Sequence, residues 1–216
     1  MTTIEMASRY IDVRGAVCSF KAGLPVIVLD DRREMEGDLA VPAEMATPEV
    51  IKFMVSKCSG LLCMAMPRSV LDHIGIPRML SSGGNHLEAP FYYPVDAASL
   101  MANGRGGTSA WDRWETVQVL TRGPACDVRD LVWPGHLIML GARDGGMRER
   151  VGHTEACTDL AVMAGLKPYA LLCEILDDEG EMAREGRLED FALQHRLPIV
   201  RVSDLVQQRR NEYSVS

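Results

Sequence analysis

The sequence predicts a layered α/β or α+β domain built around a mixed β-sheet, and three observations support this prediction. Segments with helical periodicity alternate with short apolar strands along the whole chain. Hairpin-like turns join some of the strands, which adds antiparallel pairs to the sheet. No composition break, repeat or linker divides the sequence, so residues 1–216 are expected to form a single domain.

The first elements are a helix over about residues 9–22 and two strands. Apolar side chains recur there at the spacing of one helical face, and Gly23 follows as a stop signal. These apolar residues are Val13, Ala16, Val17 and Phe20. The strands PVIVL and LAVPA, at residues 25–29 and 39–43, flank a stretch of charged residues.

A second helix, a strand and a short third helix come next. Thr47 is an N-cap residue and Pro48 suits the first helical position, so a helix is expected from there to about Lys57. GLLCMAM has the continuous apolar composition of a buried strand. The segment PRSVLDHIG is expected to form a short helix after it.

The middle of the chain contains a loop, a strand and a longer helix. SSGGN, at residues 81–85, is typical of a loop, and NGRGG of a flexible turn. FYYPV is strand-like, with Pro94 favouring an edge position or a bulge. Ser109, with Asp112 three residues later, predicts a capping box for the helix AWDRWETVQVL.

The last third alternates strands with helices. WPG, at residues 133–135, predicts a loop before the strand HLIML. Thr154 is expected to cap the helix EACTDLAVMAG, which Gly165 ends. YALLCEIL and IVRVS are predicted strands with the helix RLEDFALQHR between them, and Ser203 is expected to cap the last helix.

Composition excludes several classes of protein. The net charge of −7 argues against a nucleic-acid partner, because phosphate backbones bind to basic faces. No apolar run reaches the roughly 18 residues that span a membrane, and the first residues lack a signal-peptide pattern. The six cysteines form no C-x-x-C pair, which predicts reduced thiols in a cytoplasmic protein. Cys63 could border a pocket, but a small buried apolar residue is the simpler interpretation.

The segment LDDRREMEGDLAVPAE contains the densest run of charges between apolar flanks. Between Asp30 and Asp38 only Met35 and Gly37 are uncharged. One interpretation is a solvated hairpin turn, the usual setting of a charge run. The other is a cluster of carboxylates held over a cleft by two strands, where it binds a metal or transfers protons.

The segment RERVGHTEACTDL combines an arginine, a glycine, a histidine and a threonine at an expected helix start. The first turn of a helix offers unpaired N–H groups and a partial positive charge, which suit a phosphate. Arg150 can add a bidentate contact, Gly152 allows close approach of the backbone, and His153 and Thr154 can face the same cleft. The alternative is a plain helix cap beside a surface arginine.

Two further residues stand out in apolar strands. His136 opens the strand HLIML, where a lone histidine more often makes a structural hydrogen bond than takes part in catalysis. Glu174 interrupts LLCEIL, and a carboxylate at a buried strand position is costly unless it is paired or metal-bound. Carboxylates, imidazoles and a phosphate site together suit Mg²⁺ or Mn²⁺ and proton transfer beside the carbonyl of a sugar phosphate.

A set of motifs occurs in a fixed order along the chain. They are RREMEGD, S-A-x-D-R at Ser109–Arg113, P-G-H at Pro134–His136, R-x-G-H-T-E at Arg150–Glu155, LLCEI and DDEGEMAR. In this order they resemble 3,4-dihydroxy-2-butanone 4-phosphate synthase of riboflavin biosynthesis, from about residue 10 to 207. The length resembles that of the stand-alone enzyme, without the GTP cyclohydrolase II domain that some relatives carry.

The resemblance implies an α+β fold with three α/β/α layers and a mixed, twisted sheet, and a homodimer with its sites near the subunit interface. It implies a lyase that converts D-ribulose 5-phosphate to L-3,4-dihydroxy-2-butanone 4-phosphate and formate with Mg²⁺ or Mn²⁺. By matching position, the implied metal ligands are Glu34 and His153. The implied substrate-binding residues are Arg33, Glu34, Asp38, Arg150, Val151, Gly152, His153, Thr154 and Glu174. The implied catalytic residues are Glu36, Asp38, His136 and Glu174.

Some positions differ from the family pattern. They are Met35 in place of asparagine, Tyr92 and Pro94 in place of hydroxyl residues, Trp133 in place of arginine, and Val151 within R-x-G-H. These differences leave open a paralogue that acts on a related sugar phosphate, or a member that binds a sugar phosphate without catalysis. The retained Glu34, His136, His153 and Glu174 favour an enzyme, because a protein that only binds a sugar phosphate has no need for the buried carboxylate of Glu174.

Overall fold

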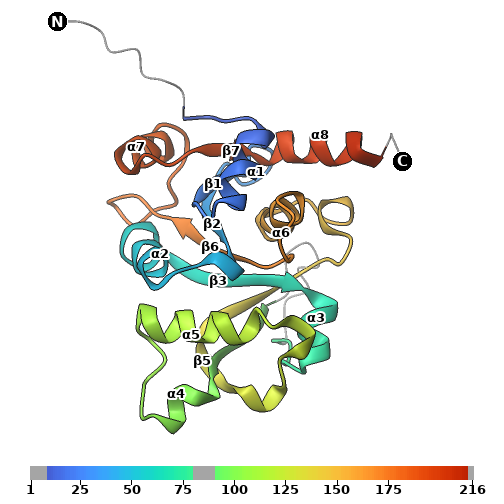
Figure 1. Ribbon diagram of the computed structural model, residues 1–216. Coiled ribbons are helices and arrows are strands. Elements are labelled where there is room, and N and C mark those ends of the chain that lie inside the picture. The colour runs from blue at the N-terminus through green and yellow to red at the C-terminus, as the bar shows by residue number, and fades with distance from the viewer. Residues whose placement is uncertain (1–8, 80–90, 214–216) are drawn as a thin grey trace, which may run out of the picture.

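The computed structural model describes residues 9–79 and 91–213, so the loop expected at residues 81–85 lies outside the described residues. Its strands are β1 (Val26–Leu29), β2 (Gly37–Pro42), β3 (Ser59–Pro67), β4 (Phe91–Ala97), β5 (Leu131–Ala142), β6 (Ala170–Ile175) and β7 (Ile199–Arg201). They form one seven-stranded sheet in the order β4-β5-β3-β6-β2-β1-β7 (Figure 1). The pairs β3–β5 and β1–β7 are parallel and the other neighbours antiparallel, so the predicted mixed sheet is confirmed.

Helices cover both faces of this sheet. They are α1 (Val13–Lys21), α2 (Pro48–Phe53), α3 (Arg68–Ile74), α4 (Ala98–Ala102), α5 (Ala110–Leu120), α6 (His153–Met163), α7 (Glu185–His195) and α8 (Val202–Tyr213). Helices α1, α6 and α8 share one hydrophobic cluster with the sheet, and α2, α3, α5 and α7 share the other. The three-layer α+β architecture is therefore confirmed.

The period-2 alternation of strand side chains separates the two clusters. In β2, Leu39 and Val41 pack on the α2/α5 side, and Ala40 between them packs on the α1/α6 side. In β6, Cys173 belongs to the first side and Leu172 to the second. This alternation decides which strand residues can reach a site on either face.

The first helix is shorter than expected. It begins at Val13, with Asp12 as an N-cap that accepts a hydrogen bond from Gly15 N at 2.8 Å. The residues before it run beside β7 instead, where Ile11 N donates to Ile199 O at 2.9 Å and Ile199 N donates to Arg9 O at 2.8 Å. Strand-like pairing at the edge of the sheet replaces the first helical turn.

The second helix starts as predicted and ends differently. Thr47 caps it by accepting a hydrogen bond from Val50 N, but the α-helix ends at Phe53. The chain continues to Cys58 as a π-helical segment, and Ser59 in the left-handed region (φ +64°) turns it into β3. Hydrophobic periodicity extends over both kinds of helix and does not distinguish them.

The expected loop at Trp133–Gly135 is wrong, because this segment belongs to β5. Strand β5 pairs with the edge strand β4 on both sides of this segment, at Leu131–Val132 and again from Leu137, and the register shifts around Pro94 confirm the predicted edge position and bulge. A Cβ at Gly135 would lie 2.1 Å from the carbonyl carbon of Val95, so the glycine allows the two strands to approach. Turn-forming residues here shape a strand pair rather than end it.

The expected cap at Ser203 is also wrong. Helix α8 begins at Val202, so Ser203 lies within its first turn. Its N–H and hydroxyl both donate to the Asp31 carboxylate, at 3.0 and 2.5 Å. A carboxylate distant in the sequence thus satisfies the helix start, which a local pattern cannot predict. Ser109, in contrast, caps α5 as predicted by accepting from Asp112 N.

Two further observations concern composition. None of the helices in the described part of the chain has the length and apolarity to cross a membrane. All six cysteines are free thiols, and Cys63 is buried in the core as a small apolar residue would be.

Tyr92 differs from the family pattern, and its side chain lies in the α2/α5-side cluster. Its hydroxyl donates to Asp72 Oδ1 and accepts from Arg78 Nε, both at 2.8 Å. We expect Tyr92→Phe to lower the free energy of unfolding by about 1–2 kcal/mol, because these hydrogen bonds are lost. Urea denaturation measures the change. Tyr93→Phe, on the more exposed neighbour, is the control, and equal losses in both variants would contradict the assignment.

Candidate functional site

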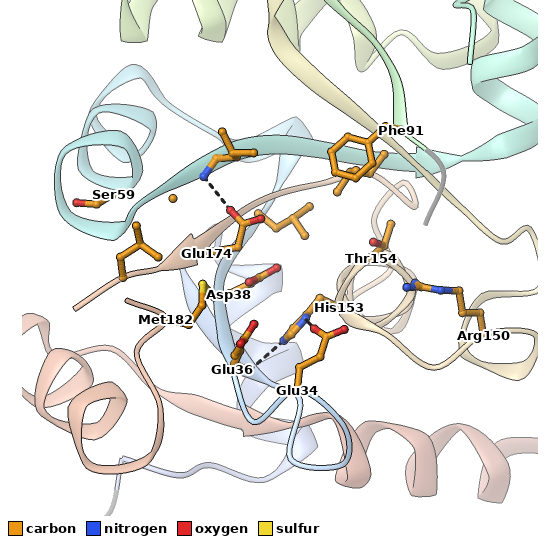
Figure 2. A pocket seen from close by; sticks show the side chains of 15 residues that line it. Glu34, Glu36, Asp38, Ser59, Phe91, Arg150, His153, Thr154, Glu174 and Met182 are labelled. Atoms are coloured by element: carbon orange, nitrogen blue, oxygen red, sulfur yellow. Dashed lines mark hydrogen bonds and ion pairs between the residues drawn. The ribbon is translucent and has the colours of Figure 1, made fainter. Parts of the chain in front are cut away.

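A cavity of about 630 Å³ opens on the α1/α6/α8 face of the sheet, at the start of α6 (Figure 2). Its polar lining comes from Glu34, Glu36, Asp38, Ser59, Arg150, His153, Thr154 and Glu174. Its apolar lining includes Leu61, Phe91, Leu140, Leu172, Leu176 and Met182. Four acidic side chains from two distant segments therefore face one space.

The carboxylates meet because β2 and β6 are antiparallel neighbours. Asp38 pairs directly with Glu174 in their register, and the alternation of both strands turns the two side chains to the same face. Glu34 and Glu36 reach the cavity from the loop before β2, which closes through hydrogen bonds of 2.9 Å between Asp30 and both Met35 and Glu36. The charged segment is thus a cleft-lining cluster rather than only a solvated turn.

Glu174 is held in place by the adjacent strand β3. Its Oε2 accepts a hydrogen bond from Leu61 N at 2.8 Å. A Cβ at Gly60 would lie 2.3 Å from the Glu174 carbonyl oxygen, so only glycine permits this approach. The carboxylate that interrupts the apolar strand therefore has a defined orientation beside Asp38.

His153 connects α6 with the charged loop. Its Nδ1 lies 3.3 Å from Glu34 Oε2 and its Nε2 lies 3.1 Å from the carbonyl oxygen of Glu36. Both partners are acceptors, so both ring nitrogens act as donors, which is the pattern of a protonated imidazole. Burial alone would lower the pKa of His153, but the negative charges of Asp38 and Glu34 raise it to about 9. The hydrogen bond with His153 in turn lowers the pKa of Glu34.

Asp38 is the most perturbed carboxylate of the site. Burial raises its pKa to about 6, against the opposing charge of His153 and with the further help of the Glu174, Glu34 and Glu36 charges. A carboxyl group that titrates near neutral pH can both accept and donate a proton during turnover. Asp38 is therefore suited to general acid–base chemistry.

The start of α6 differs from the expectation in one respect. The helix begins at His153 with Gly152 as its N-cap and no side-chain cap, so the predicted capping role of Thr154 is wrong. The helix starts two residues earlier than expected, which places Thr154 in its first turn and on the cavity wall. Arg150, just before the helix, reaches toward Thr154 (Figure 2). Its guanidinium forms an ion pair with Glu155.

Four residues expected at the site do not line the cavity of this chain, and one of them, Gly152, is the N-cap of α6. His136, on β5, is outside the cavity lining and contacts Asp96 through Nδ1 at 2.7 Å. Val151 packs against the α1/α6-side cluster, and Arg33 is exposed in the loop without lining the cavity. His136 still lies on the same face as Glu174, because Leu137 next to it packs on the opposite side.

The structure adds residues that the sequence patterns did not identify as functional. Arg184 Nη2 contacts Glu36 Oε1 at 2.6 Å, and Met182 beside it lines the cavity. Both belong to the motif DDEGEMAR. The sequence therefore marked this segment as part of the family pattern, but it did not indicate that Arg184 contacts Glu36. Phe91 and Leu61 contribute apolar walls, for which strand sequences carry no separate signal.

The donor set suits a hard divalent cation. Glu34 and His153 supply one carboxylate and one imidazole at the cavity wall, with Glu36 and Asp38 nearby. Few protein ligands, mostly oxygen, leave positions for water and substrate, as Mg²⁺ and Mn²⁺ require. Within the described residues, however, no group of three or more such side chains is arranged as a preformed metal site. The Glu34–His153 hydrogen bond would have to open for both to ligate.

Fold and site together define an α+β protein with a cavity lined by carboxylates and a histidine, a combination suited to acid–base chemistry. The family model for 3,4-dihydroxy-2-butanone 4-phosphate synthase matches residues 14–208. The chain is 43% identical over 207 residues to riboflavin biosynthesis protein RibBA of Mycobacterium ulcerans, covering 94% of this chain and 48% of that protein.

Two further relatives agree. The chain is 39% identical to the 3,4-dihydroxy-2-butanone 4-phosphate synthase of Helicobacter pylori, covering 94% of this chain and 58% of that protein. A solved 3,4-dihydroxy-2-butanone 4-phosphate synthase in complex with two magnesium ions superposes with a TM-score of 0.85 at 31% identity, covering 94% of this chain and 98% of that one. The chain spans about half the length of the curated relatives it matches. It belongs to the 3,4-dihydroxy-2-butanone 4-phosphate synthase family.

Met35 shapes the loop that carries Glu34 and Glu36, and its backbone lies in the left-handed region with φ +56°. Asparagine, the usual family residue, adopts this conformation with less strain than methionine. We expect Met35→Asn to raise the free energy of unfolding by about 0.5–1 kcal/mol. Chemical denaturation measures the effect, with Met45→Asn, whose φ is negative, as the control. A lower stability of Met35→Asn would show that the loop gains nothing from the relief of strain.

Proposed function

We propose that this chain converts D-ribulose 5-phosphate to L-3,4-dihydroxy-2-butanone 4-phosphate and formate with the help of Mg²⁺ or Mn²⁺. The observation that carries the proposal is the paired Asp38 and Glu174 beside His153 and Glu34 in one cavity. The reaction needs repeated proton transfer next to a carbonyl, and this cluster supplies carboxylates whose environments differ. Membership of the family supports the same activity.

The residues divide into three roles in this proposal. Glu34 and His153 would hold the divalent ion, which would polarise the substrate's oxygens when bound. Asp38, with its pKa near 6, and Glu174, oriented by Leu61 N, move protons during enolisation and rearrangement. Glu36, held by Arg184, lines the same space and assists them. The five-carbon phosphate is thereby divided into the four-carbon ketone phosphate and formate.

The phosphate end of the substrate is expected at the start of α6. This helix has no side-chain N-cap, so its first N–H groups are available to an anion. Arg150 and Thr154 line the cavity at that end, and a guanidinium suits phosphate oxygens. The substrate would then extend from Arg150 toward the Asp38–Glu174 pair.

We propose further that the chain works as a homodimer. At the apolar wall of the cavity and next to it, β3 and β4 expose Leu61 at 54% and Phe91 and Tyr93 at 40% each. Such a cluster of exposed apolar side chains is unfavourable in water. His136, also on this side of the sheet and 43% exposed, contributes nothing to the cavity of its own chain. A second copy packed on this face would give His136 a route to the neighbouring cavity.

The family differences support the same substrate rather than a related one. Tyr92, Trp133 and Val151 pack against the hydrophobic clusters, and neither Met35 nor Pro94 lines the cavity. None of the five positions therefore changes the shape of the cavity wall directly.

The decisive experiment is incubation of the chain with D-ribulose 5-phosphate and Mg²⁺. We expect one formate for each butanone phosphate formed, and loss of both products with a chelator. Glu174→Ala should lower turnover by at least about 10³-fold while the far-UV circular dichroism spectrum stays unchanged. Formate without the butanone phosphate would favour a paralogue with another substrate. Thermal stabilisation by the sugar phosphate without turnover would favour a binding module.

Metal binding should depend on pH through His153. With a pKa of about 9 the imidazole is protonated at pH 7, and it must lose its proton before it can ligate. We expect the apparent Mg²⁺ affinity to rise by about tenfold per pH unit between pH 7 and 8.5. Isothermal titration calorimetry in buffers of different ionisation enthalpy should show release of about one proton per ion. His195→Asn is the control, and a flat pH profile in the unmodified chain would exclude His153 as a ligand.

A further inference from the structure

We propose that Glu155 is a positioning residue, whose buried carboxylate fixes the Arg150 guanidinium at the phosphate end of the cavity. This inference rests on the proposed function, since it assigns Arg150 to the substrate's phosphate. Glu155 itself does not line the cavity, so it would act through Arg150 rather than on the substrate.

The Glu155 side chain is fully buried, with both carboxylate oxygens engaged. Oε1 accepts a hydrogen bond from Arg143 N at 3.0 Å, and Oε2 contacts Arg150 Nη1. The first contact ties the carboxylate to the backbone just after β5, so the carboxylate cannot rotate freely. The second contact, with Arg150, therefore fixes the orientation of the guanidinium as well. The Arg150 side chain is only 14% exposed.

Gly152 completes the seat of Arg150. A Cβ at this position would lie 2.6 Å from Arg150 Nη1 and 3.0 Å from its Cζ. The backbone φ of Gly152 is −171°, an extended value open to any residue, so space rather than conformation explains the glycine. The guanidinium is thus confined between the Gly152 backbone and the Glu155 carboxylate while it still lines the cavity.

The geometry also suits the electrostatics of an anion site. An arginine that binds phosphate should be oriented before the ligand arrives, because ordering a flexible cation during binding costs affinity. A buried carboxylate supplies that order, and the charge of Arg150 offsets the cost of burying Glu155. A purely structural pair would give the same stability without any effect on ligand binding, and this difference can be measured.

Helix α6 contains a matched control one turn later. Asp159 is also a buried carboxylate that accepts a backbone hydrogen bond, from Met147 N at 2.9 Å, and contacts an arginine, Arg209, at 3.2 Å. It does not line the site cavity. Asp159→Asn therefore removes the same kind of interaction from the same helix without touching the proposed phosphate end.

The test compares Glu155→Gln and Asp159→Asn in the full chain. The dissociation constant of inorganic phosphate is measured by calorimetry, and KM and kcat for ribulose 5-phosphate are measured by formate release. We expect Glu155→Gln to raise the phosphate Kd and KM roughly tenfold while kcat changes by less than about threefold. Asp159→Asn should lower the Tm by a similar amount and leave Kd and KM unchanged.

An unchanged phosphate Kd in Glu155→Gln, with a Tm loss like that of Asp159→Asn, would overturn the proposal, and so would a wild-type chain that does not bind phosphate. If Glu155→Gln does not fold, Glu155→Asp decides in its place, because its carboxylate is one methylene shorter and should also weaken phosphate binding. Absence of formate from the wild-type chain would refute the proposed function, whereas the phosphate titration would still test Glu155.

Discussion

The antiparallel pairing of β2 with β6 is the constraint on which the site depends. It places Asp38 opposite Glu174 and turns both carboxylates to one face of the sheet. Two neighbouring negative charges at a largely buried position are unfavourable unless other groups compensate. The Leu61 N–H compensates Glu174, and His153 compensates Asp38 electrostatically, so strand β3 and helix α6 are both required by this one pair.

The start of α6 is the second half of the same arrangement. His153 joins the helix to the Glu34–Glu36 loop, and Arg150 and Thr154 continue the cavity wall beyond it. Negative charge is concentrated at the β2–β6 pair, and positive charge at the helix start. A ligand with a phosphate at one end and vicinal hydroxyl and carbonyl oxygens at the other matches this separation of charge. The cavity therefore has a direction, which a uniform acidic pocket would not have.

Most elements were predictable because periodicity and capping are local properties. The helix AWDRWETVQVL with its Ser109 cap, the edge position of FYYPV and the buried strands around the charged loop all follow from nearby residues. The incorrect predictions occur where a residue distant in the sequence determines the local structure. Asp31 satisfies the start of α8, and β7 pairs with residues 9–11. Strand β4 pairs with β5 on both sides of Trp133–Gly135, which therefore lie within β5. No local window contains those partners.

The same division applies to the site. Glu174 and the charged loop were identifiable, because a carboxylate in an apolar strand and a charge run between strands are chemically unusual. The meeting of Glu34 with His153 depended on family resemblance, and the Arg184–Glu36 and Arg150–Glu155 contacts only became apparent in three dimensions. Residues that act by holding other residues carry little signal in a single sequence, since their own chemistry is ordinary.

The positions that differ from the family pattern illustrate how a sheet separates function from packing. Phe91 and Tyr92 are adjacent, yet Phe91 lines the cavity and Tyr92 packs on the opposite side against Asp72 and Arg78. A large side chain at Tyr92 therefore costs the site nothing, although the two residues are neighbours in sequence. Successive side chains of a strand point to opposite faces of the sheet. A substitution in a strand therefore affects the site directly only when its side chain points to the face that carries the site. That rule explains why the large side chains of Tyr92 and Trp133, which pack on the opposite side of the sheet, leave the arrangement of Asp38, Glu174, His153 and Glu34 intact.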